Sequence, residues 1–218
     1  MTTTPRAAFP IAREGFPFIT VGALISVSAF ALGWGWVGTA GVVLTLYLAS
    51  FFRDPPRRPP TDPSAVLAPA DGRVLKAELV HDDRFLKGPA QQVSIFMSPF
   101  NVHVNRAPVS GRVLDVRYHP GRYFRAFADK ASLDNEQNAI VIQDVHGRPM
   151  AFVQIAGFLA RRIVCYLRPG STAERGERCG MIMFGSRVDV FLPAEASLAV
   201  SVGTRTRAGE TVIAKWTT

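Results

Sequence analysis

The clearest fold signal in the chain is Met181-Ile-Met-Phe-Gly-Ser-Arg-Val-Asp-Val-Phe-Leu-Pro193. From Arg187 onward, charged residues alternate with valines, then Phe191 and Leu192 follow, and Pro193 closes the run. A period near two, together with β-branched residues, is typical of a strand. The stretch therefore predicts a β-strand that begins just after the pair Gly185-Ser186.

Short runs of the same kind recur from about Ala65 onward, and Gly, Pro and Asp separate them. They cover residues 72–80, 92–97, 139–143, 150–155, 162–167 and 211–216. Many short strands joined by turn residues favour a β-sandwich or a barrel. The sequence also allows a short helix over residues 123–132.

Two phrases resemble each other, Pro69-Ala-Asp-Gly-Arg-Val74 and Pro108-Val-Ser-Gly-Arg-Val113, and each places a glycine turn ahead of a strand. A similar rhythm returns in residues 202–214. This phrasing resembles the barrel-sandwich hybrid of biotinyl and lipoyl carriers. No lysine stands in the Met-Lys-Met context that those carriers use, so only a shared architecture is inferred. The predicted fold class is mainly β, with a barrel-sandwich-like domain.

The N-terminal part of the chain is different, because residues 16–52 contain no Asp, Glu, Lys, Arg or His. This run is longer than the roughly 20 residues that one helix needs to cross a bilayer. Its apolar core is also too long for a cleavable signal peptide. Two interpretations remain: one long tilted helix, or a hairpin of two short helices.

The centre and the flanks of the run favour the hairpin. Gly33-Trp34-Gly35-Trp36 lies in the middle, where glycine weakens a helix and tryptophan prefers the membrane–water interface. Basic residues flank both ends, which places both ends on the cytoplasmic side; they are Arg6, Arg13, Arg53, Arg57 and Arg58. We therefore predict a transmembrane helical hairpin in residues 1–52, a Pro/Arg-rich linker in 53–64 and a β domain in 65–218 on the cytoplasmic side.

Charge and cysteine content narrow the function classes. The net charge of +8 and the isoelectric point of about 10.2 suit an anionic partner. With an apolar segment in the same chain and no nucleic-acid-binding motif, the expected partner is a bilayer and not a nucleic acid. Cys165 and Cys179 are too far apart for a CxxC pair, so we expect free thiols, with no disulfide framework and no metal site.

The stretch that ends at Pro193 resembles the processing region of phosphatidylserine decarboxylases, especially the short, membrane-anchored bacterial and archaeal kind. The bacterial long form reads Leu-Gly-Ser-Thr at this point, and this chain reads Phe184-Gly-Ser-Arg187. The resemblance continues through residues 68–73, 98–108, 118–121 and 131–136, and it covers the chain from Ala68 to its end. It implies an enzyme that converts phosphatidylserine to phosphatidylethanolamine and carbon dioxide. It also implies a location in the inner cell membrane and a homodimer.

The resemblance further implies that the chain cuts itself between Gly185 and Ser186, into a β chain (1–185) and an α chain (186–218). The Ser186 hydroxyl attacks the preceding carbonyl and converts the amide into an ester. Elimination leaves dehydroalanine, which hydrolyses to a covalent pyruvoyl group at residue 186. The ketone of that group would form a Schiff base with the substrate amine and accept the electrons left when carbon dioxide departs.

In the family, an Asp–His–Ser arrangement activates the serine, and Asp71 and His103 are the matching residues here. The long bacterial form has two histidines in the segment that matches residues 98–108, and its self-cleavage is attributed to the second. This chain keeps only His103, and Arg106 stands where the second would be. Whether His103 serves self-cleavage, decarboxylation or both is left open by the sequence.

Three alternatives compete with this hypothesis. The first is a decarboxylase of the same kind that acts on a related lipid, such as archaetidylserine. A membrane-tethered serine hydrolase would use Ser186, His103 and Asp71, although the Gly-x-Ser-x-Gly elbow is absent. A non-enzymatic membrane adaptor would carry a β domain without chemistry. The last two predict an intact chain with an ordinary serine at position 186.

Overall fold

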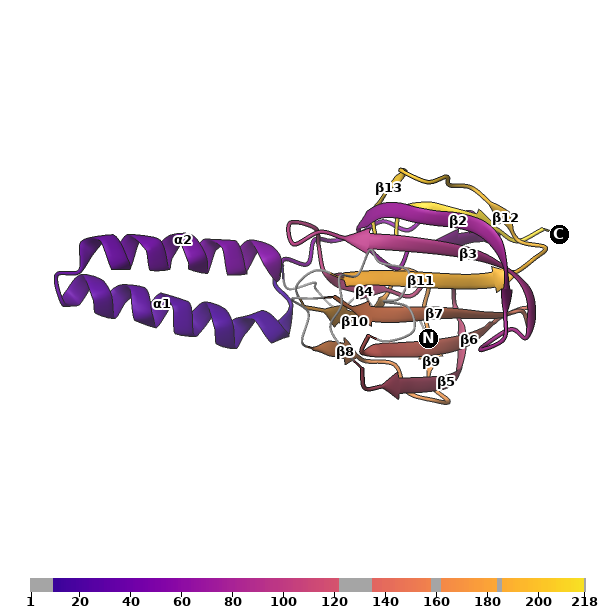
Figure 1. Cartoon of the computed structure of the whole chain (residues 1–218), viewed down its shortest axis with the longest axis horizontal. Helices are drawn as coiled ribbons and strands as arrows, with labels where there is room; N and C mark the ends of the chain where they lie inside the picture. Colours follow the sequence, from indigo (N-terminus) through magenta and orange to yellow (C-terminus); the bar gives the residue numbers. More distant parts are fainter. Residues whose placement is uncertain (1–9, 122–134, 158–161, 184–185, 218) are drawn as a thin grey trace. The chain divides into compact units, whose positions relative to one another are not determined.

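The structure is a computed structural model, and it describes residues 10–121, 135–157, 162–183 and 186–217. The chain divides into two compact units, one up to Pro56 and one from Arg57 onward. Figure 1 shows a pair of helices in the first unit and β-sheets in the second. The predicted helix over residues 123–132 lies outside the described residues. The predicted division into hairpin, linker and β domain stays a prediction.

The first unit is a helical hairpin. A short 3-10 turn, η1 (Arg13–Gly15), leads into α1 (Phe16–Ala31), and α2 (Gly35–Phe51) follows after a turn in which Gly33 has a φ of +77°. Small residues let the helices approach closely: a side chain at Gly22 would meet Thr45, and one at Gly41 would meet Ser26. The predicted turn at the Gly-Trp-Gly-Trp stretch is therefore confirmed.

The outer faces of the hairpin are apolar. Leu24, Val27 and Trp36 expose 62%, 66% and 81% of their surface. Among the described residues, Arg13–Ala31 is long and apolar enough to cross a membrane, and Gly35–Phe51 is a shorter apolar helix. That the hairpin spans the bilayer stays a prediction.

The second unit is built from short antiparallel strands, as the alternating runs predicted. The strands are β1 (Ala65–Leu67), β2 (Gly72–Asp82), β3 (Gly88–Met97), β4 (Val104–Arg106), β5 (Gly111–His119), β6 (Gln137–Asp144), β7 (Pro149–Ala156), β8 (Ile163–Cys165), β9 (Thr172–Ala173), β10 (Arg178–Ile182), β11 (Ser186–Pro193), β12 (Ser197–Leu198), β13 (Arg205–Thr206) and β14 (Val212–Lys215). The large sheet has the order β13-β2-β3-β11-β7-β6-β5-β9, and two small sheets have the orders β1-β14-β12 and β4-β10-β8. The mainly β, barrel-sandwich-like class is confirmed.

Each run that the alternation marked as a strand contains one. The strand predicted just after Gly185-Ser186 is β11, whose described part begins one residue earlier, at Ser186 itself. It pairs with β3 on one side and β7 on the other, near the middle of the large sheet (Figure 1). Its residues Val188, Val190 and Leu192 belong to the main apolar core, whereas Phe191 packs in a smaller cluster with residues such as Ile155.

The strand orders show that the β unit consists of two similar halves. The first half contains β1, β2, β3 and β11 to β14, and the second contains β4 to β10. The order of the large sheet reads the same from either end when β13 is matched with β9, β2 with β5, β3 with β6 and β11 with β7. Two reciprocal hydrogen bonds join the halves: Leu67 N–H donates to Pro108 O, and Arg106 N–H donates to Pro69 O, both at 3.0 Å. The repeated phrases around Pro69 and Pro108 are thus matching parts of the two halves.

The glycines of these phrases have a physical reason. A Cβ at Gly72 would overlap the carbonyl oxygen of Phe96, and a Cβ at Gly111 would overlap that of Gln143. Each glycine begins a strand that bulges shortly afterwards, within residues 74–76 in β2 and 113–115 in β5. Only glycine fits where the two backbones approach so closely.

Candidate functional site

Ser186 is the first residue of β11 and is completely buried. It pairs with Met97 at the end of β3 and with Ala156 at the end of β7. Its hydroxyl oxygen lies 3.3 Å from the sulfur of Met97 and donates to it. The described part of β11 begins at this residue, and Gly185 lies outside the described residues. The predicted nucleophile is therefore held in an apolar setting in a central strand.

Asp71 lies just before β2 and accepts three hydrogen bonds. The Nη2 of Arg57 donates to both carboxylate oxygens, at 3.1 and 2.9 Å, and the backbone N–H of Ala208 donates to Oδ1 at 2.7 Å. The side chains of Arg57 and Asp71 expose only 7% and 13% of their surface. A carboxylate offers about four lone-pair sites, so a further donor has room. Arg57 thus balances the charge of Asp71, which the sequence alone did not indicate.

The equivalent position in the other half of the β unit explains part of this arrangement. Ser110 stands before Gly111 as Asp71 stands before Gly72, and its Oγ accepts the backbone N–H of Arg175 at 3.0 Å. The fold therefore needs a side-chain acceptor at this point in both halves. A serine is sufficient for that structural task, so the carboxylate of Asp71 is not explained by the fold.

His103 is completely buried in the segment that leads from β3 to β4. Its Nδ1 lies 2.9 Å from the backbone oxygen of Asn101. Because a carbonyl oxygen only accepts, Nδ1 carries the proton, and in the neutral ring Nε2 carries the lone pair of a base. The carbonyl oxygen of His103 accepts the N–H of Ile182 at 3.4 Å, so His103 lies beside the strand that precedes the Gly185-Ser186 pair.

None of these hydrogen bonds joins two of the three predicted residues directly. They are connected instead through Asn105, which the sequence analysis did not single out. Its Nδ2 lies 3.4 Å from the backbone oxygen of Pro69, two residues before Asp71, and 3.8 Å from the sulfur of Met97, which contacts Ser186. Asn105 follows His103 by two residues, so it links the neighbourhoods of all three. Its only signal in the sequence is that it belongs to the family-like segment 98–108, two residues after His103.

The opposite face of β11 carries a second buried polar group. Arg187 and Asp189 are 1% and 0% exposed, and Nε and Nη2 of the arginine donate to the two carboxylate oxygens at 2.6 Å each. Two charge-assisted bonds within one strand hold the residues that follow Ser186. This face is separate from the one that carries Met97 and Asn105, because successive side chains of a strand point to opposite sides.

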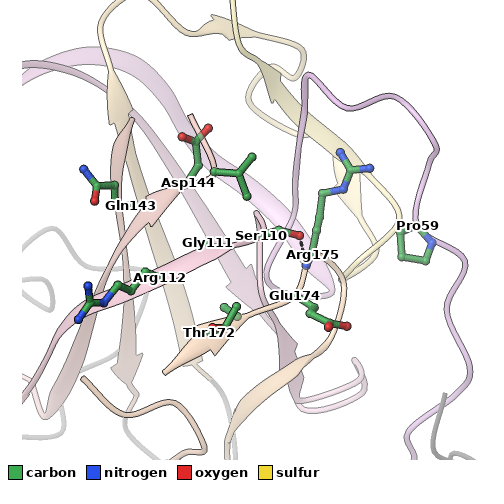
Figure 2. Close-up of a pocket in the computed structure, with 11 residues that line it drawn as sticks. Pro59, Ser110, Gly111, Arg112, Gln143, Asp144, Thr172, Glu174 and Arg175 are labelled. Atoms are coloured by element: carbon green, nitrogen blue, oxygen red, sulfur yellow. Dashed lines mark hydrogen bonds between the residues drawn. The ribbon is translucent and has the colours of Figure 1, made fainter. Parts of the chain in front are cut away.

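A cavity of about 690 Å³ lies elsewhere, at the matching end of the second half (Figure 2). Figure 2 shows Ser110, Arg112, Gln143, Asp144 and Arg175 around it. Two of its charged groups are already engaged: Arg175 donates to backbone oxygens, and Asp144 pairs with Arg148 at 2.7 Å. Ser186, His103 and Asp71 do not line it. Among the described residues, no group of three or more His, Cys, Asp or Glu side chains is arranged to hold a metal ion.

Both cysteines are free thiols. Cys179 is buried and Cys165 is partly buried, and burial raises the pKa of each thiol, that of Cys179 well above its usual value. The expectation of free thiols agrees with this arrangement, and the raised pKa makes both thiols less reactive, since a thiolate is the reactive form.

Comparisons with known proteins bear on the whole chain. The family model described as phosphatidylserine decarboxylase matches residues 44–214. The chain is 46% identical over 205 residues to a phosphatidylserine decarboxylase proenzyme of Burkholderia mallei, a match that covers 94% of each chain. It is 46% identical over 205 residues to the protein of the same name from Burkholderia multivorans, covering 94% of this chain and 95% of the relative. It is 45% identical over 204 residues to that of Desulfotalea psychrophila, with the same shares covered.

Proposed function

The chain belongs to the phosphatidylserine decarboxylase family, and we propose that it prepares its own catalytic group by cutting itself between Gly185 and Ser186. As an enzyme of this family, it decarboxylates phosphatidylserine to phosphatidylethanolamine and carbon dioxide. Its relatives are named proenzymes, which is consistent with a chain that is processed after synthesis. The cut site, the group formed there and the roles of Ser186, His103 and Asp71 are the proposal.

The observation that supports the cut site best is the position of Ser186 at the start of β11. Every ladder pair of β11 with β3 among the described residues, from Ser186 with Met97 to Pro193 with Ala90, lies on the C-terminal side of the proposed cut, and residues 184 and 185 lie outside the described part. The pairs from Arg187 to Pro193 therefore keep their backbone groups after the cut, whereas residue 186 gives up its amide nitrogen when the pyruvoyl group forms. The fragment 186–218 keeps its place between β3 and β7, and the new N-terminus stays where the serine was.

The chemistry of the cut balances as follows. The Ser186 oxygen bonds to the carbonyl carbon of Gly185, its proton passes to a base, and the amide nitrogen leaves that carbon as an amine. Loss of the Cα proton and of the ester oxygen then releases a Gly185 carboxylate and leaves dehydroalanine at residue 186. Water adds, ammonia leaves, and a pyruvoyl group remains.

His103 is our candidate for the base in the first step. It is fully buried, and the bond from Nδ1 to Asn101 leaves the lone pair on Nε2. Asp71, whose charge Arg57 balances, is the family-matched candidate for the third member of the arrangement. Whether the same histidine later donates a proton to the product carbon is a separate question, which a cleaved His103 variant would answer.

The setting of Ser186 also fits a pyruvoyl group. When formed, such a group supplies a ketone that accepts the electrons released as the substrate carboxylate leaves as carbon dioxide. Residues Met97 and Ala156 beside position 186 are completely buried and apolar. An apolar setting disfavours a carboxylate and favours neutral carbon dioxide, so these residues assist the reaction by keeping water away.

We further propose that the hairpin anchors the enzyme in the inner cell membrane, with the β unit on the cytoplasmic side, as a homodimer. The apolar helix Arg13–Ala31 and the basic flanks of residues 16–52 support the anchor and its orientation. A tag after residue 218 should resist external protease in intact spheroplasts and be removed after lysis. Removal from intact spheroplasts would contradict the orientation. Cross-linking in the membrane should yield a dimer band, and a monomer alone would contradict the homodimer.

Mass spectrometry of the denatured full-length protein tests the cut. We expect fragments 1–185 and 186–218 in place of the intact 23.8 kDa chain, with residue 186 as pyruvoyl. Ser186→Ala should stay intact and release no carbon dioxide from phosphatidylserine vesicles. Ser171→Ala is the matched control, because Gly170-Ser171 is another Gly-Ser pair, and it should be cut like the wild type. An active wild-type chain with an ordinary serine at 186 would refute the proposal and favour a hydrolase or another mechanism.

A further inference from the structure

Three amide side chains form a hydrogen-bonded row inside the β unit. Asn138 of β6 donates from Nδ2 to Oε1 of Gln154 at 3.0 Å, and Gln154 of β7 donates from Nε2 to Oδ1 of Asn105 in β4 at 2.9 Å. Their exposed fractions are 2%, 0% and 0%. The row therefore crosses from the large sheet to the small sheet without contact with solvent.

The row ends beside the proposed nucleophile. Nδ2 of Asn105 faces the sulfur of Met97 at 3.8 Å, and that sulfur accepts the hydroxyl of Ser186 at 3.3 Å. The same Nδ2 faces the backbone oxygen of Pro69 at 3.4 Å. Each contact is long and weak by itself, but together they fix the thioether against which the hydroxyl rests.

Space for this row is left by a glycine. A Cβ at Gly180 in β10 would overlap the backbone oxygen of Val164 and lie 2.9 Å from Nε2 of Gln154. Nε2 of Gln154 lies 3.4 Å from that same oxygen of Val164. The absence of a side chain at Gly180 thus lets the glutamine amide lie between the two sheets.

The other half of the β unit shows that the fold does not require an amide at the positions of Asn105 and Gln154. Asn105 lies three residues before Pro108, and its counterpart three residues before Pro69 is Val66. The pair Ile142–Met150 in the second half matches the pair Ile95–Val188 in the first. Gln154 lies four residues after Met150, so its counterpart is Leu192, four residues after Val188.

Val66 and Leu192 are both completely buried in the apolar core. Burial of an amide costs free energy that only its hydrogen bonds recover, whereas a valine and a leucine carry no such cost. Asn105 and Gln154 therefore occur in the half where they reach the Met97 sulfur beside Ser186, and their equivalent positions in the other half are filled by apolar side chains. The counterpart of Asn138 is an amide too, Gln91, so Asn138 is not part of this contrast.

We propose that Asn105 and Gln154 are positioning residues for self-cleavage. They hold the Met97 sulfur, and through it the Ser186 hydroxyl, in the orientation from which the oxygen attacks the preceding carbonyl. This inference rests on the proposed cut between Gly185 and Ser186. Because the serine oxygen departs from residue 186 during the reaction, the row acts on the rate of the cut.

The test uses the variants that the other half suggests, Asn105→Val, Gln154→Leu and the double variant, each in the full-length chain. The rate of appearance of the 186–218 fragment is followed during cell-free synthesis with lipid nanodiscs. Thermal stability is measured separately on Ser186→Ala precursors, so that every sample is uncut. We expect each single variant to lose stability, because one buried amide loses its partner.

The double variant separates positioning from stability. It restores the apolar pair of the other half, so it should unfold at a higher temperature than either single variant. Its cut should nevertheless stay at least about tenfold slower than in the wild type, since a misplaced nucleophile costs orders of magnitude in rate. Asp82→Asn is the matched control: Asp82 is 3% exposed, accepts backbone N–H groups of residues 84–86 and lies at the other end of β2. It should lose stability and be cut at the wild-type rate.

The outcomes distinguish the two proposals. A wild-type chain that never yields the 186–218 fragment would refute the proposed cut, whatever the variants do. A wild type that is cut, together with a double variant cut equally fast, would refute the positioning role alone. Rates that simply follow unfolding temperature across all variants, Asp82→Asn included, would also refute it.

Discussion

The pairing of Arg57 with Asp71 gives a prediction that needs no assumption about the reaction. Arg57→Met keeps most of the side-chain volume and removes the charge. It leaves the Asp71 carboxylate, 13% exposed, with the Ala208 N–H as its remaining partner among the bonds described above. Breaking a fully buried ion pair costs about 3–5 kcal/mol. Because both side chains keep some exposure, we expect a loss of about 2–4 kcal/mol in the free energy of unfolding.

The assay is thermal unfolding of full-length Ser186→Ala protein in one detergent, followed by the circular dichroism of the β unit. For a unit of this size, about 2–4 °C per kcal/mol corresponds to a fall in midpoint of roughly 4–16 °C. The double variant Arg57→Met, Asp71→Asn should recover part of this loss, because the uncompensated charge is gone.

Arg207→Met is the matched control. Arg207 is 75% exposed at the side chain and lies 4.0 Å from Glu210, a residue that Arg57 also contacts at 3.4 Å. An exposed pair of this kind contributes at most about 1 kcal/mol. If Arg57→Met unfolds at the same temperature as Arg207→Met, or if Asp71→Asn worsens the Arg57→Met protein, the reasoning about a compensated buried carboxylate is wrong.

Three further predictions follow from groups outside this pair. Burial would raise the pKa of Asp144, but the hydrogen bonds from Arg148 and His146 outweigh it and lower that pKa. The stability contributed by this carboxylate is therefore present above about pH 4 and is lost as the pH falls through the lowered value. Asp144→Asn should unfold about 1–2 kcal/mol more easily at pH 7, and this difference should shrink as the pH falls below about 4; a difference that stays the same at every pH would contradict this. In the folded protein at pH 8, Cys165 should react with iodoacetamide faster than Cys179, which should react only after unfolding. Peptide mass spectrometry of the alkylated chain measures both rates, and equal rates would contradict the burial of the Cys179 thiol. Gly180→Ala should both lower the unfolding midpoint and slow the cut, because a Cβ there meets the amide row, and an unchanged rate of fragment release would show that the strands relax around it.

Local pattern was enough to predict the longer alternating strands, such as β2, β3 and β11, and the two apolar helices, but it did not mark short strands such as β4 and β10. The alternation from Arg187 to Leu192 predicted β11, and the uncharged run of residues 16–52 with its Gly-Trp-Gly-Trp centre predicted two helices joined near Gly33. Such features depend on side-chain periodicity and on backbone freedom at glycine, which neighbouring residues alone determine.

The partners of the predicted site residues could not be predicted in this way. Arg57 was placed in a linker, and it is buried against Asp71 within the β unit, because an extended segment can lie along a distant strand without any local pattern that says so. Gln154 stands in an apolar run, and nothing in the run shows that its amide meets Asn105 across two sheets.

The sequence by itself determined that a strand follows Gly185, although it placed the start of that strand one residue late, and the surrounding motifs identified Gly185-Ser186 as the candidate cut site. Only the tertiary structure decided what surrounds Ser186: the Met97 sulfur from β3 and the amide row that reaches it from β4, β6 and β7. The physical reason is that strand pairing and sheet stacking join residues 49 and 89 positions apart, as in Gln154 with Asn105 and Ser186 with Met97. Those contacts depend on the register of the whole sheet, which no single stretch of sequence contains.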